Sequence, residues 1–156
     1  RPFGLPSLPA SPDPEADTVS MSVHFPWNQL IGEGLLAYEF RAEATRLTVH
    51  MMNAVIQNLK QNRAFYQRYH AESGAGIGER NALQGLAPVG LFMQTLGVTI
   101  LSSTRVKLEG KNLYPWPVTI KYKGLTIVRG LEQTTVTFIN GESAIVKEEQ
   151  PCIVEM

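Results

Sequence analysis

The residue types best suited to chemistry occur together in the segment 65–74, which reads Phe-Tyr-Gln-Arg-Tyr-His-Ala-Glu-Ser-Gly and leads into a glycine-rich run at 74–78. Sugar sites need this mixture, because flat apolar rings pack on the C–H face of a sugar and planar polar groups hydrogen-bond its hydroxyls. Tyr69, His70 and Glu79 are therefore candidates for contact with a sugar. An aromatic-rich helix end buried against a neighbour explains the same residues equally well, so both interpretations stay open.

Other kinds of chemistry find little support. Aspartate occurs only at positions 13 and 17, so carboxylate chemistry elsewhere in the chain must use glutamate. The three histidines lack the spacing of metal ligands, and the single cysteine, Cys152, cannot form an internal disulfide. We therefore predict no metal and no cofactor.

Charge and hydropathy exclude some partners. Fourteen basic and fourteen acidic residues give zero formal charge, so nothing builds the basic surface that nucleic acid requires. The longest apolar stretch, 86–93, contains Pro88 and Gly90 and is too short to span a membrane. We expect neither nucleic acid nor a membrane as partner. The compartment stays open, with the cytoplasm favoured.

The sequence divides into three zones of different composition, which must position the candidate site residues. Residues 1–26 hold six of the ten prolines, which predicts a segment that is extended or packed on a surface. Residues 27–97 are predicted to be helical, and residues 98–156 change to a two-residue period. The fold class expected is α+β, with helices first and a small antiparallel β-domain after them.

The helical zone is predicted from its four-residue spacing. Leu47, Met51, Val55 and Leu59 indicate one helix from about 42 to 70, and a further helix is expected from about 82 to 96, with Gly97 as its stop. Arg41 is placed in the turn before the first of these. The helices are apolar over wide arcs, which predicts neighbours outside this sequence, either further upstream helices or a partner chain.

The β-zone is predicted from alternation and turn dipeptides. Strands are expected around 105–109, 118–123 and 135–138, and Asn140-Gly141 is the strongest hairpin signal. The stiff aromatic turn at 114–117 contains Trp116, which we interpret as an anchor for the strands rather than a binding platform.

A resemblance enters at this point. Pro26-Trp27-Asn28, then Gly34-Leu35-Leu36 and a long helix, then the segment 65–74 and a helix ending at Leu96-Gly97 resemble the closing helices of (α/α)-barrel glycoside hydrolases, in the trehalase, processing α-glucosidase and glycogen-debranching group. The resemblance covers about residues 20–100. It implies that Trp27 and Asn28 lie near a sugar pocket, and that the strands after it form the small β-domain that some of these enzymes carry.

The sequence departs from this family at one important position. The family's motif aromatic-Glu-x-Tyr supplies the general base, whereas this chain has Gln67 in Tyr66-Gln67-Arg68-Tyr69, and an amide cannot act as a base at neutral pH. The base could have moved to Glu72 or Glu79, the protein could bind sugar without cleaving it, or the glutamate could have been replaced deliberately. Gln67 and Glu72 are the positions where catalysis would be sought.

The sequence therefore predicts the carboxy-terminal portion of a glycoside hydrolase that acts on α-linked sugars, with an oligosaccharide as substrate. This portion would contribute pocket residues without a complete active site. The alternative is a non-catalytic module that binds carbohydrate or serves in assembly. Whether the chain takes part in catalysis stays open.

Overall fold

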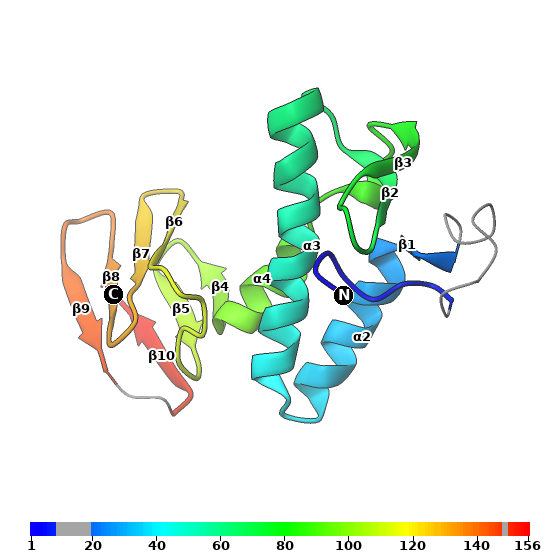
Figure 1. Cartoon of the computed structure of the whole chain (residues 1–156). Helices are drawn as coiled ribbons and strands as arrows, with labels where there is room; N and C mark the ends of the chain where they lie inside the picture. The colour runs from blue at the N-terminus through cyan, green and yellow to red at the C-terminus, as the bar shows by residue number, and fades with distance from the viewer. Residues whose placement is uncertain (9–19, 148–149) are drawn as a thin grey trace. The chain divides into compact units, whose positions relative to one another are not determined.

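The computed structural model describes residues 1–8, 20–147 and 150–156. These residues form helices and β-strands in an α+β fold (Figure 1). The chain divides into two compact units, residues 1–91 (unit 1) and residues 92–156 (unit 2). Each unit is described by itself below. The predicted α+β class is confirmed, whereas strands at Tyr66–His70 and Gly76–Arg80 lie inside the zone predicted to be helical.

Two helices that lie side by side form the frame of unit 1 (Figure 1). Helix α2 (Phe25–Ala37) has Pro26 in its first turn, where the missing N–H is no loss. Helix α3 (Arg41–Asn62) ends at Arg63, whose left-handed backbone directs its N–H to the Leu59 carbonyl. Arg41 therefore begins α3, and the prediction that placed it in the connecting turn is wrong.

The segment expected to complete the long helix is a β-hairpin instead. Strand β2 (Tyr66–His70) pairs with β3 (Gly76–Arg80) on one side and with the short β1 (Ser22–Val23) on the other. The prediction of a helix up to residue 70 is therefore wrong. The helix ends early because the backbone of Arg63 is left-handed. The aromatic residues that follow Arg63 favour a strand.

The predicted helix at 82–96 is also shorter than expected. A 3₁₀ turn η1 (Leu83–Gly85) is followed by helix α4 (Val89–Leu96). Pro88 separates them, because proline disfavours helical backbone in the residue before it and lacks the N–H of a helix interior. The predicted stop is confirmed, since Gly97 has a φ of 71° and its N–H donates to the Gln94 carbonyl.

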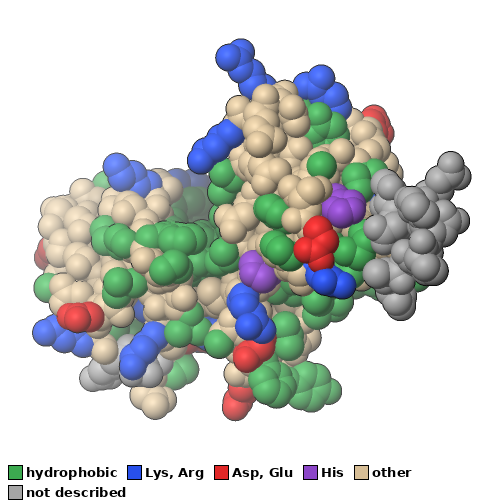
Figure 2. All heavy atoms as spheres, viewed as in Figure 1, with side chains coloured by type: hydrophobic (Ala, Val, Ile, Leu, Met, Phe, Trp, Pro, Cys, Tyr) green, Lys and Arg blue, Asp and Glu red, His purple; other side chains and the backbone are tan. Residues whose placement is uncertain are grey.

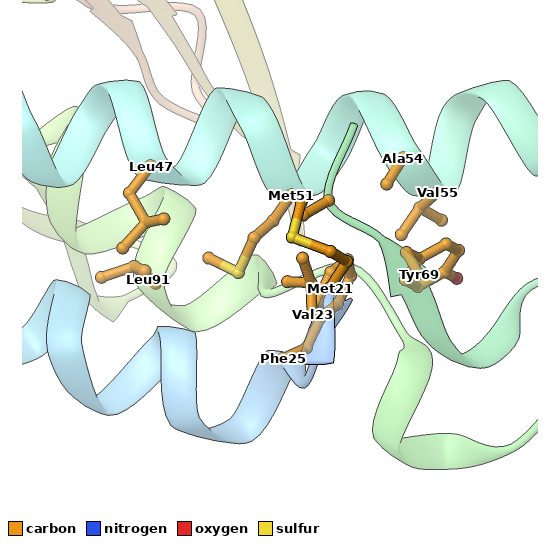
Figure 3. Close-up of a cluster of buried hydrophobic side chains, with 10 residues drawn as sticks. Met21, Val23, Phe25, Leu47, Met51, Ala54, Val55, Tyr69 and Leu91 are labelled. Atoms are coloured by element: carbon orange, nitrogen blue, oxygen red, sulfur yellow. The ribbon is translucent and has the colours of Figure 1, made fainter. Parts of the chain in front are cut away.

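The core of unit 1 lies between α3 and the residues that lead from β1 into α2 (Figure 3). Met51 of α3 points toward Met21, Val23 and Phe25, and Leu47 lies opposite Leu91 of α4. Burial of such side chains contributes about 1.5–3 kcal/mol each. This cluster fixes β1 and the start of α2 on α3.

Residues 1–8 pack across this unit. The N–H of Phe3 donates to the Ala71 carbonyl, and the N–H groups of Ser7 and Leu8 donate to the carbonyls of Ser22 and Ser20. The ring of Phe3 fills the space next to Gly74, where a Cβ atom would come within 2.7 Å of it. Of the Pro-rich zone predicted at 1–26, residues 9–19 lie outside the described part.

Unit 2 contains two antiparallel sheets. The first has the order β10-β5-β4, from Cys152–Glu155, Arg105–Leu108 and Val98–Ser102. The second has the order β6-β7-β8-β9, from Val118–Tyr122, Leu125–Arg129, Thr134–Thr137 and Ser143–Val146. The predicted strands match β5, β6 and β8, and the expected hairpin turn at Asn140-Gly141 joins β8 to β9.

Buried polar groups tie the parts of unit 2 together. The Arg129 guanidinium, 3 % exposed, donates to the carbonyls of Leu96, Glu109 and Gly110 and to the Thr134 hydroxyl. These bonds connect the end of α4 and the loop after β5 to strands β7 and β8. Arg129 therefore organises the centre of this unit.

Candidate functional site

The outer face of the small sheet in unit 1 carries polar side chains. Ser22 pairs with His70 and Val23 with Tyr69, so continuing the same register puts His24 opposite Arg68. Because side chains alternate along strands, Val23 and Tyr69 face the core, where both are 0 % exposed. Ser22, His24 and Arg68 then share the opposite face.

A pocket of about 520 Å³ lies over this face. Its described walls come from the N-terminal segment, β1, the first turns of α2 and strand β2, and they are Leu5, Pro6, Ser7, Leu8, Ser22, His24, Trp27, Asn28, Ile31 and Arg68. The Trp27 side chain is 64 % exposed, so its ring offers a flat apolar surface at the edge of the pocket. The volume suits a ligand of one or a few sugar rings.

Three buried polar atoms in the walls of this pocket have no hydrogen-bond partner among the described residues: Ser22 Oγ, His24 Nδ1 and Arg68 Nε. A buried polar atom left without a partner costs about 1–3 kcal/mol. No other such side-chain atom occurs in the described part of the chain. Their gathering at one pocket makes this pocket the candidate ligand site in the described part of the chain.

The electrostatics of the pocket are set by one cation. Burial lowers the pKa of His24, and the neighbouring Arg68 charge lowers it further, so His24 is neutral near pH 7. Among the described residues that line the pocket, none is acidic and only Arg68 carries a full charge. The pocket therefore has a positive character and no carboxylate of its own within those walls.

Asn28, predicted to lie near a sugar, does line the pocket, but its polar atoms bind the protein itself. Its Oδ1 accepts from the Leu5 N–H at 2.8 Å, and its Nδ2 donates to the carbonyls of Leu5 at 2.9 Å and His24 at 3.1 Å. The Asn28 side-chain amide thus binds both the N–H and the carbonyl of Leu5, as the backbone of a neighbouring strand would. Asn28 holds the N-terminal wall of the pocket on α2.

We expect Asn28→Ala to lower the free energy of unfolding of unit 1 by about 2 kcal/mol, because it breaks both partly buried hydrogen bonds to the Leu5 backbone and the bond to the His24 carbonyl. Urea unfolding followed by fluorescence measures this loss, and amide exchange of Leu5 should quicken. The control is Asn53→Ala on the exposed face of α3, which should be neutral or slightly stabilising. Unchanged exchange at Leu5 would contradict this role.

Tyr69, another predicted sugar contact, belongs to the core. Its ring stacks on Phe25 with centroids 4.7 Å apart. Its hydroxyl donates to the Gly85 carbonyl at 2.8 Å and accepts from the Tyr66 N–H at 3.0 Å. Burial raises the pKa of this phenol above its ordinary value. Tyr69 joins the hairpin to η1 and does not line the pocket.

The glycines of the hairpin make room for the protein's own side chains. A Cβ on Gly76 would meet the Tyr66 ring at 2.1 Å, and one on Gly78 would meet Gln67 Oε1 at 2.5 Å. Gln67 therefore packs across the hairpin over Gly78, and it is not among the described residues of the pocket.

The remaining candidates also lie away from the pocket. His70 Nδ1 faces the N–H groups of Glu72 and Ser73 at 3.3 Å, which places it in the tight turn of the hairpin. Glu72 forms an ion pair with Arg1 at 2.8 Å, and Glu79 is exposed on β3. Of the seven predicted site residues, the structure therefore brings only Trp27 and Asn28 to this pocket.

Sequence reasoning missed Ser22, His24 and Arg68. The available signal was Ser22-Val23-His24, a polar-apolar-polar alternation typical of a half-buried strand. Because residues 66–70 were predicted to be helical, they were not recognised as the strand that pairs with Ser22 and Val23. Strand pairing is what brings Arg68 opposite His24.

No family model, curated protein or solved structure matches this chain. Within the described residues no group of three or more His, Cys, Asp or Glu side chains could hold a metal ion. No described helix combines the length and apolar character needed to cross a membrane.

Proposed function

We propose that this chain contributes a carbohydrate pocket to a glycoside hydrolase acting on α-linked sugars, as its closing helices and terminal β-domain, without a complete active site of its own. The observation that carries the proposal is the gathering of three unpartnered polar atoms beside the exposed Trp27 ring in one pocket. The family resemblance of the segment 26–97 gives the proposal its enzyme class.

The pocket has the two features that sugar recognition requires. The Trp27 ring and the side chain of Ile31 supply apolar surface for the C–H face of a sugar ring. Ser22, His24 and Arg68 supply hydrogen-bonding atoms for hydroxyl groups, and the Ser22 Oγ, His24 Nδ1 and Arg68 Nε atoms have no hydrogen-bond partner among the described residues. A sugar would therefore satisfy them without breaking an existing bond.

Hydrolysis needs a carboxyl pair that the described walls of the pocket lack. Inverting and retaining glycosidases both use two carboxyl groups about 5–9.5 Å apart. No acidic side chain is among the described lining residues, and Gln67 packs over Gly78. The proposal therefore assigns binding to this pocket and the acid and base to other parts of the enzyme.

The exposed apolar face of α2 supports the proposal that further helices pack next to this pocket. Trp27, Leu30, Ile31 and Tyr38 recur at helical spacing along it, and all are exposed, as is Phe40 just beyond. In Figure 2 hydrophobic side chains gather over the turn that joins α2 to α3. An apolar stripe of this kind is covered in most proteins, here by barrel helices from outside this sequence or from a partner chain.

We expect Trp27→Ala to weaken binding of methyl α-D-glucopyranoside or methyl α-D-mannopyranoside about tenfold or more, because it removes the stacking surface. Isothermal titration calorimetry on the whole chain measures the dissociation constants. Trp116→Ala is the matched control, since it deletes a half-exposed tryptophan from unit 2 and should leave affinity unchanged.

The second candidate function is a non-catalytic module for carbohydrate binding or assembly. The exposed apolar stripe on α2 favours it, because such a surface serves assembly without any sugar. Loss of binding in Trp116→Ala, with Trp27→Ala unaffected, would favour a binding module in unit 2. Absence of binding to every α-linked sugar tested would leave assembly and overturn the proposed pocket.

A further inference from the structure

We infer that the pocket of unit 1 selects sugars that carry a carboxylate, such as a hexuronic acid or its glycoside, with Arg68 as the residue that binds the acid group. This inference rests on the proposed function and names the substrate class of the same pocket.

The first argument is the state of Arg68. Its Nε is buried without a hydrogen-bond partner among the described residues, and the ion pairs Arg1–Glu72, Arg105–Glu155 and Lys107–Glu109 do not include it. A partly buried guanidinium is stable when it donates two parallel N–H bonds to a planar anion. Since the described walls offer no carboxylate, the ligand is the natural source of one.

The second argument is the start of α2. No side chain caps this helix, and its first turn contains no acidic residue, so the partial positive charge of its N-terminus is not offset there. His24 and Trp27 of this turn line the pocket. An anion bound beside them gains from this charge as well as from Arg68.

Ser22 supplies an independent sign of a ligand at the same place. This residue is 1 % exposed and lines the pocket, and its buried hydroxyl has no hydrogen-bond partner among the described residues. The Ser22 hydroxyl can donate a hydrogen bond to a carboxylate oxygen. The neutral His24 ring can donate a hydrogen bond from one of its two nitrogens and accept one at the other. Hydrogen-bonding groups from β1, from the residue that precedes α2 and from β2 can therefore meet one acid group.

The charge of the pocket favours a carboxylate over a phosphate. A phosphate monoester carries about 1.5–2 negative charges at neutral pH, whereas Arg68 is the single charged residue among the described walls. Burial and Arg68 both hold the pKa of His24 below its ordinary value in the protein without ligand. One cation balances one carboxylate.

The test compares two ligands that differ only at C6, methyl α-D-glucuronide and methyl α-D-glucoside. Calorimetric titration of the whole chain should give an affinity about tenfold or more higher for the glucuronide. Arg68→Gln should abolish this preference, because it lowers the affinity for the glucuronide much more than the affinity for the neutral glucoside. Retained glucoside binding shows that the variant is folded.

Two further variants sharpen the result. Arg68→Lys keeps the charge but not the planar fork, so it should keep only part of the preference. Arg63→Gln removes an exposed arginine that is not a described wall of the pocket, and it should keep the preference in full.

The possible outcomes separate this inference from the proposed function. Equal affinity for the two glycosides, or a preference that survives Arg68→Gln, overturns the inference while the carbohydrate pocket stands. Tighter binding of α-D-glucose 1-phosphate than of the glucuronide overturns the choice of a carboxylate. Absence of binding to all three ligands overturns both proposals.

Discussion

Replacing Gly85 by alanine should lower the free energy of unfolding of unit 1 by about 3 kcal/mol or more. A Cβ atom on Gly85 would lie 1.5 Å from the carbonyl oxygen of Tyr66 and 2.6 Å from its carbon. These are backbone atoms of strand β2, so no side chain can rotate away to relieve the clash. Turn η1 would have to leave the hairpin.

Displacement of η1 would also break the hydrogen bond that joins this turn to strand β2 of the hairpin. The Tyr69 hydroxyl donates to the Gly85 carbonyl at 2.8 Å, and its loss leaves a buried phenol partly unsatisfied. Because β2 carries Arg68, the proposed pocket should be damaged together with stability. Urea unfolding followed by the fluorescence of Trp27, in a Trp116→Phe background, measures the change for unit 1.

Gly34→Ala is the matched control, with an expected effect of opposite sign. Gly34 lies inside α2, and a Cβ atom there would meet nothing within 4 Å. Alanine should therefore stabilise the helix by about 0.5–1 kcal/mol. If Gly85→Ala unfolds at the same urea concentration as the parent protein, the close approach of η1 to β2 is wrong.

The second large effect is expected at Arg129 in unit 2. Arg129→Met should lower the free energy of unfolding by about 3 kcal/mol, which corresponds to a fall in Tm on the order of 15 °C for a unit of this size. Methionine fills much of the space but donates no hydrogen bonds. The carbonyls of Leu96, Glu109 and Gly110 would each lose their bond to the guanidinium.

The measurement uses Trp116, which lies in the same unit, in a Trp27→Phe background. Lys121→Met is the control, because it removes one positive charge from an exposed position of β6 and should change stability by less than about 0.5 kcal/mol. Arg129→Lys should recover only part of the loss, since an ammonium group cannot reach acceptors in three directions at once. Full recovery would show that charge alone matters at this position.

Much of unit 2 could be predicted from the sequence. Its strands alternate polar and apolar residues, as at Val118-Thr119-Ile120, and its turns are marked by Lys123-Gly124 and Asn140-Gly141. Such turns are local, so neighbouring residues determine both the hairpin and its register. The long-range position of Arg129 at the centre of this unit could not be seen in any local pattern.

In unit 1 the sequence predicted α3 but extended it too far. The spacing of Leu47, Met51 and Val55 is helical, whereas the segment 66–70 mixes polar and aromatic residues without a unique period. Its strand conformation is stabilised by pairing with β3 in a hairpin and with β1, a segment distant along the chain.

By itself the sequence determined an α+β chain, helices that are apolar over wide arcs and the candidate aromatic Trp27. Only the tertiary structure decided which polar groups line the candidate pocket. It used Asn28 and Tyr69 to hold the fold, and through the register of β1 on β2 it placed Ser22, His24 and Arg68 on one face. The physical reason is that strand pairing and burial depend on contacts between distant segments, which residue types and spacing do not encode locally.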